Sequence, residues 1–174
     1  LWMKQLNPVF GKIHPPESIA EFLGLTPYDI DQDWPIQEVS TGVAFFLVPL
    51  KTREALIQVQ LDKRKIGEYN KNTEAKWPLI FCKYPESPEN HLKVRMITSH
   101  SEDPATGSAN GCLAGYLAKY KYFGSSKVEV RVEQGAEIGR PSLLYLKSED
   151  HGDVIDVYVG GKNSMVAKGE LFLN

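Results

Sequence analysis

The sequence predicts an α+β fold in which a strand-rich, mostly antiparallel and barrel-like wrap surrounds one buried central helix. The strongest observation is the segment from Gly107 to Tyr120, which has almost no polar face before Lys119, and a helix of this kind is normally buried on every side. The other apolar segments are short and are separated by glycines and prolines, as in antiparallel sheets. No repeat or flexible linker marks an internal boundary, so the 174 residues are interpreted as one unit.

The composition is that of an ordinary globular protein, with 42% hydrophobic and 24% charged residues. The net charge of -2 argues against a nucleic acid or an anionic membrane as the main partner. The longest apolar stretch, residues 43–50, is far shorter than the roughly 20 residues of a membrane span, and no signal peptide opens the chain. The two cysteines make no disulfide framework, so we expect a cytoplasmic protein.

The first half of the chain predicts short helices and paired strands. Two prolines and an acidic first turn predict a helix over residues 15–23 that ends at Gly24, and Thr26 with Pro27 signals a second start. The elements that follow are strands over 37–40 and 43–50, helices over 52–57 and 62–72, and strands over 79–84 and 92–98.

The second half contains the central helix and four predicted strands, over 128–133, 142–147, 154–159 and 165–173. Within the helix, Gly107, Gly111 and Gly115 recur at a spacing of four, so one stripe lacks side chains. Each glycine costs about 1 kcal/mol relative to alanine in a helix interior. We therefore expect another segment of the chain to pack closely against this stripe.

A candidate ligand site lies where the central helix begins. The amino end of a helix has unpaired backbone N–H groups and a partial positive charge, and Gly107 leaves this backbone open. The N–H groups of Gly107, Ser108 and Ala109, with the Ser108 hydroxyl, suit a substrate carboxylate. Asp103 stands at the mouth of this pocket, where a carboxylate can accept or relay a proton. Ordinary capping of the helix by Asp103, Thr106 and Ser108 is the alternative explanation of the same residues.

Other candidates point to structure more than to chemistry. The histidines are scattered along the chain, at His14, His91, His100 and His151, and form no zinc signature. His100 is interpreted as a solvated loop residue. Cys82 and Cys112 lie in segments expected to be buried, where a cysteine acts as a small hydrophobic residue. Arg140 is either a carboxylate partner or part of a turn that leads into a strand.

The segment Glu102-Asp103-Pro104-Ala105-Thr106-Gly107-Ser108-Ala109 resembles the signature of the PhzF-like phenazine-biosynthesis family, which shares the diaminopimelate-epimerase fold. Shorter motifs occur in the order that the family uses, at residues 40–42, 48–50, 94–96, 134–135, 139–142, 159–161 and 169. Members of the family have two similar lobes, each a strand-rich wrap around a helix, with the active site between them. Residues 1–174 resemble the C-terminal lobe only, and an N-terminal lobe is expected to be absent or to lie on an upstream segment or another chain.

The resemblance implies an isomerase that moves a proton on a small carboxylic acid without a metal or an organic cofactor. It implies a proton-handling role for Asp103 and gives Gly107 and Ser108, with Thr106 beside them, the binding of the substrate carboxylate. The family's glutamate and histidine elements belong to the other lobe, so the expected partners are a small carboxylate and either that lobe or a second copy of this chain. Residues 97–100 depart from the aromatic residue and proline that the family more often has there, which changes the expected cleft lining.

Two other functions are compatible with the same sequence. One is a non-catalytic module of the same fold that binds a small carboxylate or dimerises. The other is a structural or interaction domain with a well-capped helix. Epimerase chemistry is not assigned, because Cys112 lies beyond the motif position at which an epimerase of this fold has a cysteine.

Overall fold

One curled, ten-stranded sheet organises the chain in the computed structural model, which describes residues 1–170 and 172. The strands are β1 (Trp2–Lys4), β2 (Val9–His14), β3 (Ile36–Ser40), β4 (Ala44–Pro49), β5 (Trp77–Cys82), β6 (Leu92–Ile97), β7 (Glu102–Asp103), β8 (Lys127–Gln134), β9 (Ser142–Asp150) and β10 (Ile155–Gly161). The α-helices are α1 (Pro16–Leu23), α2 (Arg53–Gln58), α3 (Lys63–Tyr69) and α4 (Gly107–Lys119). Short 3-10 turns cover Pro27–Asp29, Asn70–Asn72 and Ala136–Ile138.

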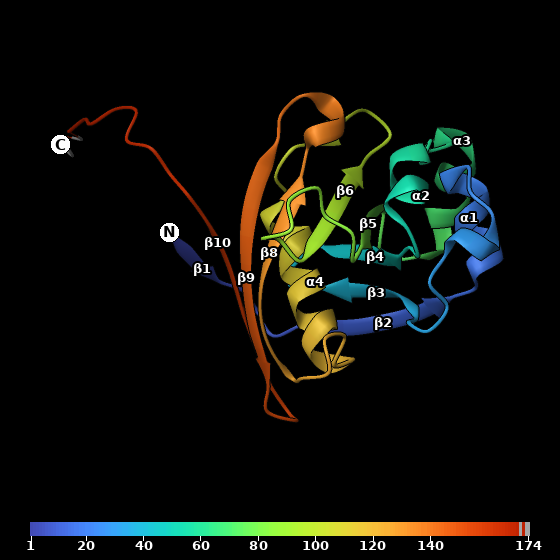
Figure 1. Cartoon of the computed structure of the whole chain (residues 1–174), viewed down its shortest axis with the longest axis horizontal. Helices are drawn as coiled ribbons and strands as arrows, with labels where there is room; N and C mark the ends of the chain where they lie inside the picture. The colour runs from blue at the N-terminus through green and yellow to red at the C-terminus, as the bar shows by residue number, and fades with distance from the viewer. Residues whose placement is uncertain (171, 173–174) are drawn as a thin grey trace.

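The sheet runs in the order β1-β10-β9-β8-β6-β5-β4-β3-β2, with β7 paired to β6 (Figure 1). Most neighbouring strands are antiparallel. The β4–β5 and β6–β8 pairs are parallel. Helix α4 connects the parallel strands β6 and β8 and lies inside the curl, between β8–β10 and β2–β4, whereas α1, α2 and α3 gather on the other side (Figure 1). The predicted strand-rich wrap around one central helix is therefore confirmed.

Every helix and strand predicted between residues 15 and 161 is present, with ends that differ by at most three residues. The predictions omitted β1, β2 and β7. Strand β2 has a weak signal because its pairing with β3 is interrupted by a register shift between Phe10 and Ile13.

The strand predicted over residues 165–173 is wrong where the structure describes it. Residues 162–170 are irregular, and in Figure 1 they run away from the sheet after β10. The physical reason is that the pairing of β10 ends at Gly160 with β1 and at Gly161 with β9, so the residues that follow have no neighbouring strand to bond among the described residues. Residues 171 and 173 lie outside the described residues.

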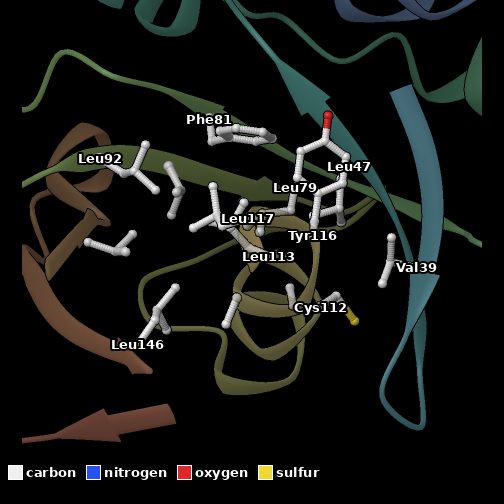
Figure 2. Packing of buried hydrophobic residues seen from close by; sticks show 14 of the residues in the cluster. Val39, Leu47, Leu79, Phe81, Leu92, Cys112, Leu113, Tyr116, Leu117 and Leu146 are labelled. Atoms are coloured by element: carbon white, nitrogen blue, oxygen red, sulfur yellow. The ribbon is translucent and has the colours of Figure 1, made fainter. Parts of the chain in front are cut away.

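Helix α4 is buried along nearly its whole length, as its apolar composition predicted. Residues 109–118 are all buried, and Figure 2 shows Cys112, Leu113, Tyr116 and Leu117 surrounded by side chains of the strands. Because side chains alternate along a strand, β3, β4 and β5 also supply the opposite face of the sheet, where a second core forms beneath α1, α2 and α3. The curled sheet thus separates two cores.

The glycine stripe of α4 packs against the segment between β1 and β2, as expected from its spacing. A Cβ atom at Gly111 would lie 2.9 Å from Cγ of Gln5, and one at Gly115 would lie 2.5 Å from Cγ of Pro8. At Gly107 the nearest atom is Cε of Met3 at 3.9 Å, an ordinary contact. The stripe is therefore closed along the helix and more open at its amino end.

Candidate functional site

The amino end of α4 is held next to the sheet by strand β7. The pairing of β7 with β6 places Asp103 opposite Met96, and α4 begins four residues later at Gly107. The half-buried Asp103 carboxylate accepts a hydrogen bond from the Ala105 N–H at 3.2 Å and another from the Thr106 hydroxyl at 2.9 Å. Asp103 and Thr106 are thus brought together, and the carboxylate is fixed within the loop that enters the helix.

Thr106 occupies the capping position of α4 but does not cap it. Its side chain makes no capping hydrogen bond; its hydroxyl donates to the Asp103 carboxylate and accepts from the Gln134 NH₂ group. The side-chain capping that the alternative explanation expected at Thr106 is therefore not made. Gly107 and Ser108 follow in the first turn and are both half-buried.

Gln134, at the end of β8, connects this loop with the helix. Its side-chain NH₂ group donates to the Asp103 carbonyl at 2.7 Å and to the Thr106 hydroxyl at 3.0 Å. Its side-chain oxygen accepts from the Thr106 N–H at 3.2 Å and from the Asn110 side chain at 2.9 Å. We call Asp103, Thr106, Asn110 and Gln134 the amino-end network.

The role of Gln134 was not predicted from the sequence, although a signal exists. Val128, Val130 and Val132 are the buried positions of β8, and Gln134 continues the same alternation as a buried polar residue. A glutamine at an inward position needs polar partners inside the protein. Such a residue therefore marks a polar contact, but the partner is 28 positions away in the sequence and has no local signal.

A hollow of about 540 Å³ reaches the amino end of α4 at Ala105 and Gly107. The rest of its lining comes from β1, from the start of β9 and from the end of β10 with the residues that follow: Leu1, Met3, Ser142, Leu143, Leu144, Val159, Gly160, Gly161, Lys162 and Asn163. Asp103, Thr106 and Ser108 are not among the lining residues. The hollow thus meets the helix at Gly107, and Ser108 and the Asp103 loop lie next to that point in the chain.

The turn after Gln134 supports the loop from the side. Gly135 has a φ of +84°, and a Cβ atom there would lie 2.9 Å from Cα of Pro104, so the two loops pack backbone to backbone. The same turn carries Glu137, which pairs with the buried Lys93 at 2.8 Å. Burial acts to lower the pKa of Lys93, but its bonds to Glu137 and Glu86 outweigh burial and raise that pKa. Lys93 therefore stays charged and anchors the turn.

Strand β7 is anchored by a second ion pair. Arg95 donates to the two carboxylate oxygens of Glu102 at 3.0 and 2.8 Å, and both side chains are nearly buried. The same guanidinium donates to the carbonyls of Leu56 and Val59, at and just after the carboxyl end of α2. This bidentate ion pair, together with the bonds to the two carbonyls, connects β7, the strand that carries Asp103, to α2 on the other face of the sheet.

The remaining sequence candidates have structural positions. His100 is exposed in its loop, and Arg140 is exposed in the turn that begins at Gly139 and leads into β9, which favours the turn interpretation. Cys82 and Cys112 are buried, and burial raises the pKa of both thiols. Among residues 1–170 and 172, no group of three or more histidine, cysteine or acidic side chains could hold a metal ion.

One buried cluster was missed entirely. His14 of β2 lies between Glu38 of β3 and Tyr69 of α3, at 2.8 Å from the Glu38 carboxylate and 2.7 Å from the tyrosine hydroxyl. Glu38 also accepts hydrogen bonds from the N–H groups of Glu74 and Ala75. We call His14, Glu38 and Tyr69 the outer triad, because it lies in the second core, on the face of the sheet away from α4.

A curled sheet wrapped around a central helix is also the fold of solved proteins described as belonging to the PhzF family. A phenazine biosynthesis protein of that family from Bacillus anthracis superimposes with a TM-score of 0.82 at 24% identity, over 92% of this chain and 56% of that one. A predicted epimerase from Pseudomonas aeruginosa superimposes with a TM-score of 0.73 at 27% identity, over 99% of this chain and 58% of that one.

The chain belongs to the PhzF family, since the family model described as "Phenazine biosynthesis-like protein" matches residues 2–169. A trans-2,3-dihydro-3-hydroxyanthranilate isomerase from Pseudomonas fluorescens is 41% identical over 177 residues, which cover 98% of this chain and 58% of the relative. An uncharacterised isomerase from Mesorhizobium japonicum is 31% identical over 167 residues, which cover 91% of this chain and 55% of the relative. The chain therefore spans little more than half the length of these relatives. Within the described residues, no helix is long and apolar enough to cross a membrane.

Proposed function

We propose that this chain supplies one half of the active site of a cofactor-independent isomerase, which moves a proton between two carbons of a small carboxylic acid. The observation that carries the proposal is the amino end of α4, which Thr106 leaves without a side-chain cap and which a hollow of about 540 Å³ reaches at Gly107. Membership of a family with isomerases among its members supports the reaction class.

The first turn of α4 binds the substrate carboxylate in this proposal. The N–H groups of Gly107 and Ser108 point along the helix axis toward its amino end, where the partial positive charge of the helix favours an anion. The Ser108 hydroxyl adds a donor, and Thr106 holds the Asp103 carboxylate next to this turn. Gly107 presents no side chain to the hollow, so a carboxylate can approach the backbone.

Asp103 handles the proton. In the isomerisation a base takes a proton from one carbon, the freed electron pair shifts through the conjugated system, and another carbon gains a proton, so atoms and charge balance. Two groups on opposite sides of the substrate are needed for this shift. Asp103 is one of them, and the opposing acid or base belongs to a second lobe, whether on the same polypeptide, on another chain or in a second copy.

Deuterium exchange tests the proposal. The chain, together with a second lobe supplied by the N-terminal half of a relative, is incubated in D₂O with trans-2,3-dihydro-3-hydroxyanthranilate, the compound named for several relatives, and deuterium entering the ring carbons is followed by NMR. Asp103→Asn is expected to lower the exchange rate about 100-fold or more. Ser108→Ala is expected to weaken binding of the substrate. Asp153→Asn, in the exposed turn before β10, is the matched control and should exchange like the unchanged chain.

The second candidate is a non-catalytic module that binds a small carboxylate or dimerises. It is favoured by the exposed apolar side chains of Leu1, Met3 and Leu6, around the hollow and next to it, which suit a partner surface. Binding of anthranilate, a stable aromatic carboxylate, without exchange in the presence of any second lobe would support this module. Sedimentation measures its self-association. If Asp103→Asn and Ser108→Ala both leave binding and exchange unchanged, the site assignment is wrong.

A further inference from the structure

We propose that Gln134 is a positioning residue of this site, which sets the distance and orientation between Asp103 and the first turn of α4. The inference rests on the proposed function, because it concerns how the same site is held. Gln134 is only 1% exposed, so it acts through its neighbours and does not itself touch a ligand.

The side-chain amide of Gln134 uses its full set of groups on the two parts of the site. Both donor hydrogens bind the loop, at the Asp103 carbonyl and the Thr106 hydroxyl. The oxygen accepts from the Thr106 N–H, at the end of the loop, and from the Asn110 side chain, in the helix. A planar amide has fixed angles between these groups. One rigid side chain therefore fixes the loop relative to the helix.

The direction of the Thr106 hydroxyl follows from this arrangement. A hydroxyl has one hydrogen to donate, and the Gln134 NH₂ group can only donate to it. The Thr106 hydrogen is therefore directed at the Asp103 carboxylate, 2.9 Å away. Hydrogen bonds in such a chain strengthen one another in a buried setting. Gln134 thus orients the Asp103 carboxylate through Thr106.

The hydrogen bond between Gln134 and Asn110 attaches Gln134 to the helix one turn beyond Thr106. Asn110 is fully buried, and its NH₂ group bonds both the Gln134 oxygen and the Thr106 carbonyl. Its own oxygen has no hydrogen-bond partner among the described residues. The two bonds of the Asn110 NH₂ group therefore tie the first turn of α4 to Gln134 and to Thr106.

The test measures ligand binding by the full chain and by Gln134→Leu, which keeps the bulk of the side chain and removes all four bonds. Anthranilate is titrated while the amide resonances of Gly107 and Ser108 are followed by NMR. We expect the dissociation constant to rise about tenfold or more, and the two resonances to shift in the free variant. Gln134→Asn, which is one methylene shorter and cannot reach all four partners, carries the same test if the leucine variant does not fold.

Gln37→Leu is the matched control. Gln37 is also buried, donates to the Gly11 carbonyl and accepts from the Tyr120 hydroxyl, so it holds the carboxyl end of α4. A helix of 13 residues is about 20 Å long. This variant loses bonds of the same kind far from the site, and its affinity for anthranilate should stay within twofold of the unchanged chain.

A double-mutant cycle separates positioning from a general loss of structure. If Gln134 acts through Thr106, the double variant Gln134→Leu with Thr106→Val should bind anthranilate about as tightly as the single variant with the lower affinity. Additive losses in the cycle, or Gln134 variants that bind within twofold with unmoved Gly107 and Ser108 resonances, overturn the inference and leave the proposed function intact. Failure of the unchanged chain to bind anthranilate overturns both.

Discussion

The outer triad and the amino-end network lie on opposite faces of one sheet, and they differ in whether they adjoin a solvent-accessible hollow. The outer triad lies beneath the helices and does not line the hollow of about 540 Å³, with a His14 side chain that is 0% exposed, a Glu38 side chain that is 6% exposed and a half-buried Tyr69 at its edge. Three members of the amino-end network are buried as well, but its Asp103 is half-buried, and the helix that follows it faces a hollow at Gly107. Both clusters are densely hydrogen-bonded, so the adjoining hollow, and not the hydrogen bonding, distinguishes the candidate site.

The outer triad is best understood as a stabilising connection. It joins β2, β3 and α3, and the second oxygen of Glu38 holds the backbone of residues 74 and 75. Burial lowers the pKa of His14, against the opposing influence of Glu38. A mostly neutral imidazole between a hydroxyl and a carboxylate fits a buried structural role.

Removal of Glu38 is the largest expected effect and tests this interpretation. Glu38→Ala leaves the buried His14 ring and the backbone N–H groups of Glu74 and Ala75 without their acceptor. Each buried unpaired donor costs about 1–3 kcal/mol, so the free energy of unfolding should fall by roughly 3–5 kcal/mol.

Urea denaturation measures that change. The control is Glu129→Ala, whose carboxylate is exposed and makes only a surface pair with Lys147, so its unfolding free energy should change by less than about 0.5 kcal/mol. A loss below about 1 kcal/mol for Glu38→Ala would show that the triad does not hold the outer face together.

The comparison also shows what the sequence could predict. A candidate site at the amino end of α4 could be predicted because Asp103, Thr106, Gly107 and Ser108 are neighbours in the chain and form a local pattern. The period of apolar residues likewise predicted α4 and most of the strands. Strands β1 and β2 were missed, because their pairing is short or interrupted and depends on distant strands.

Side chains that meet through the sheet have no such local pattern. Gln134 is 28 positions from Thr106, and His14 is 24 positions from Glu38 and 55 from Tyr69. Only the strand order brings them together, so the outer triad and the role of Gln134 required the structure. The sequence could therefore propose the residues of one candidate site but not the side chains that support them.

The next largest effect is expected at Gly115, where the glycine stripe of α4 packs against the segment between β1 and β2. Gly115→Ala adds a methyl group 2.5 Å from Cγ of Pro8, so the segment between β1 and β2 must shift. Overpacking of this kind costs about 1–3 kcal/mol. The melting temperature should fall, as measured by circular dichroism.

Gly67→Ala in α3 is its control, because a Cβ atom there meets nothing within 4 Å. Alanine is the better helix former, so this variant should be unchanged or slightly more stable. An unchanged melting temperature for Gly115→Ala would mean that the stripe is as open at Gly115 as at its amino end.

Acidification should weaken the outer triad more than the amino-end network. Because the folded-state pKa of His14 lies below its unfolded value near 6.5, the unfolded chain binds more protons between those two values. The contribution of His14 is fully present above about pH 6.5 and is lost as the pH falls toward its folded pKa, by at most about 1.4 kcal/mol per pH unit.

The stability slope between pH 5 and 7, from urea denaturation, checks this expectation. His14→Gln should flatten the slope, whereas His100→Gln, at an exposed loop position, should leave it unchanged. The carboxylates with lowered pKa values, such as Glu133, titrate mostly below this window. The same slope in both variants would contradict a role for His14.

The smallest effect on stability, and the sharpest test of the open end, is expected from Gly107→Ala. The new methyl group would lie 3.9 Å from the nearest side-chain atom outside its own helix turn, at a residue that lines the hollow. The unfolding free energy should change by less than about 1 kcal/mol. The direction should be toward greater stability, because alanine has a higher helix propensity than glycine. Anthranilate binding should nevertheless weaken, because the methyl group keeps the carboxylate from the backbone N–H groups. A variant that binds as well as the unchanged chain would mean that the ligand does not approach α4 at Gly107, and that openness alone does not distinguish the two clusters.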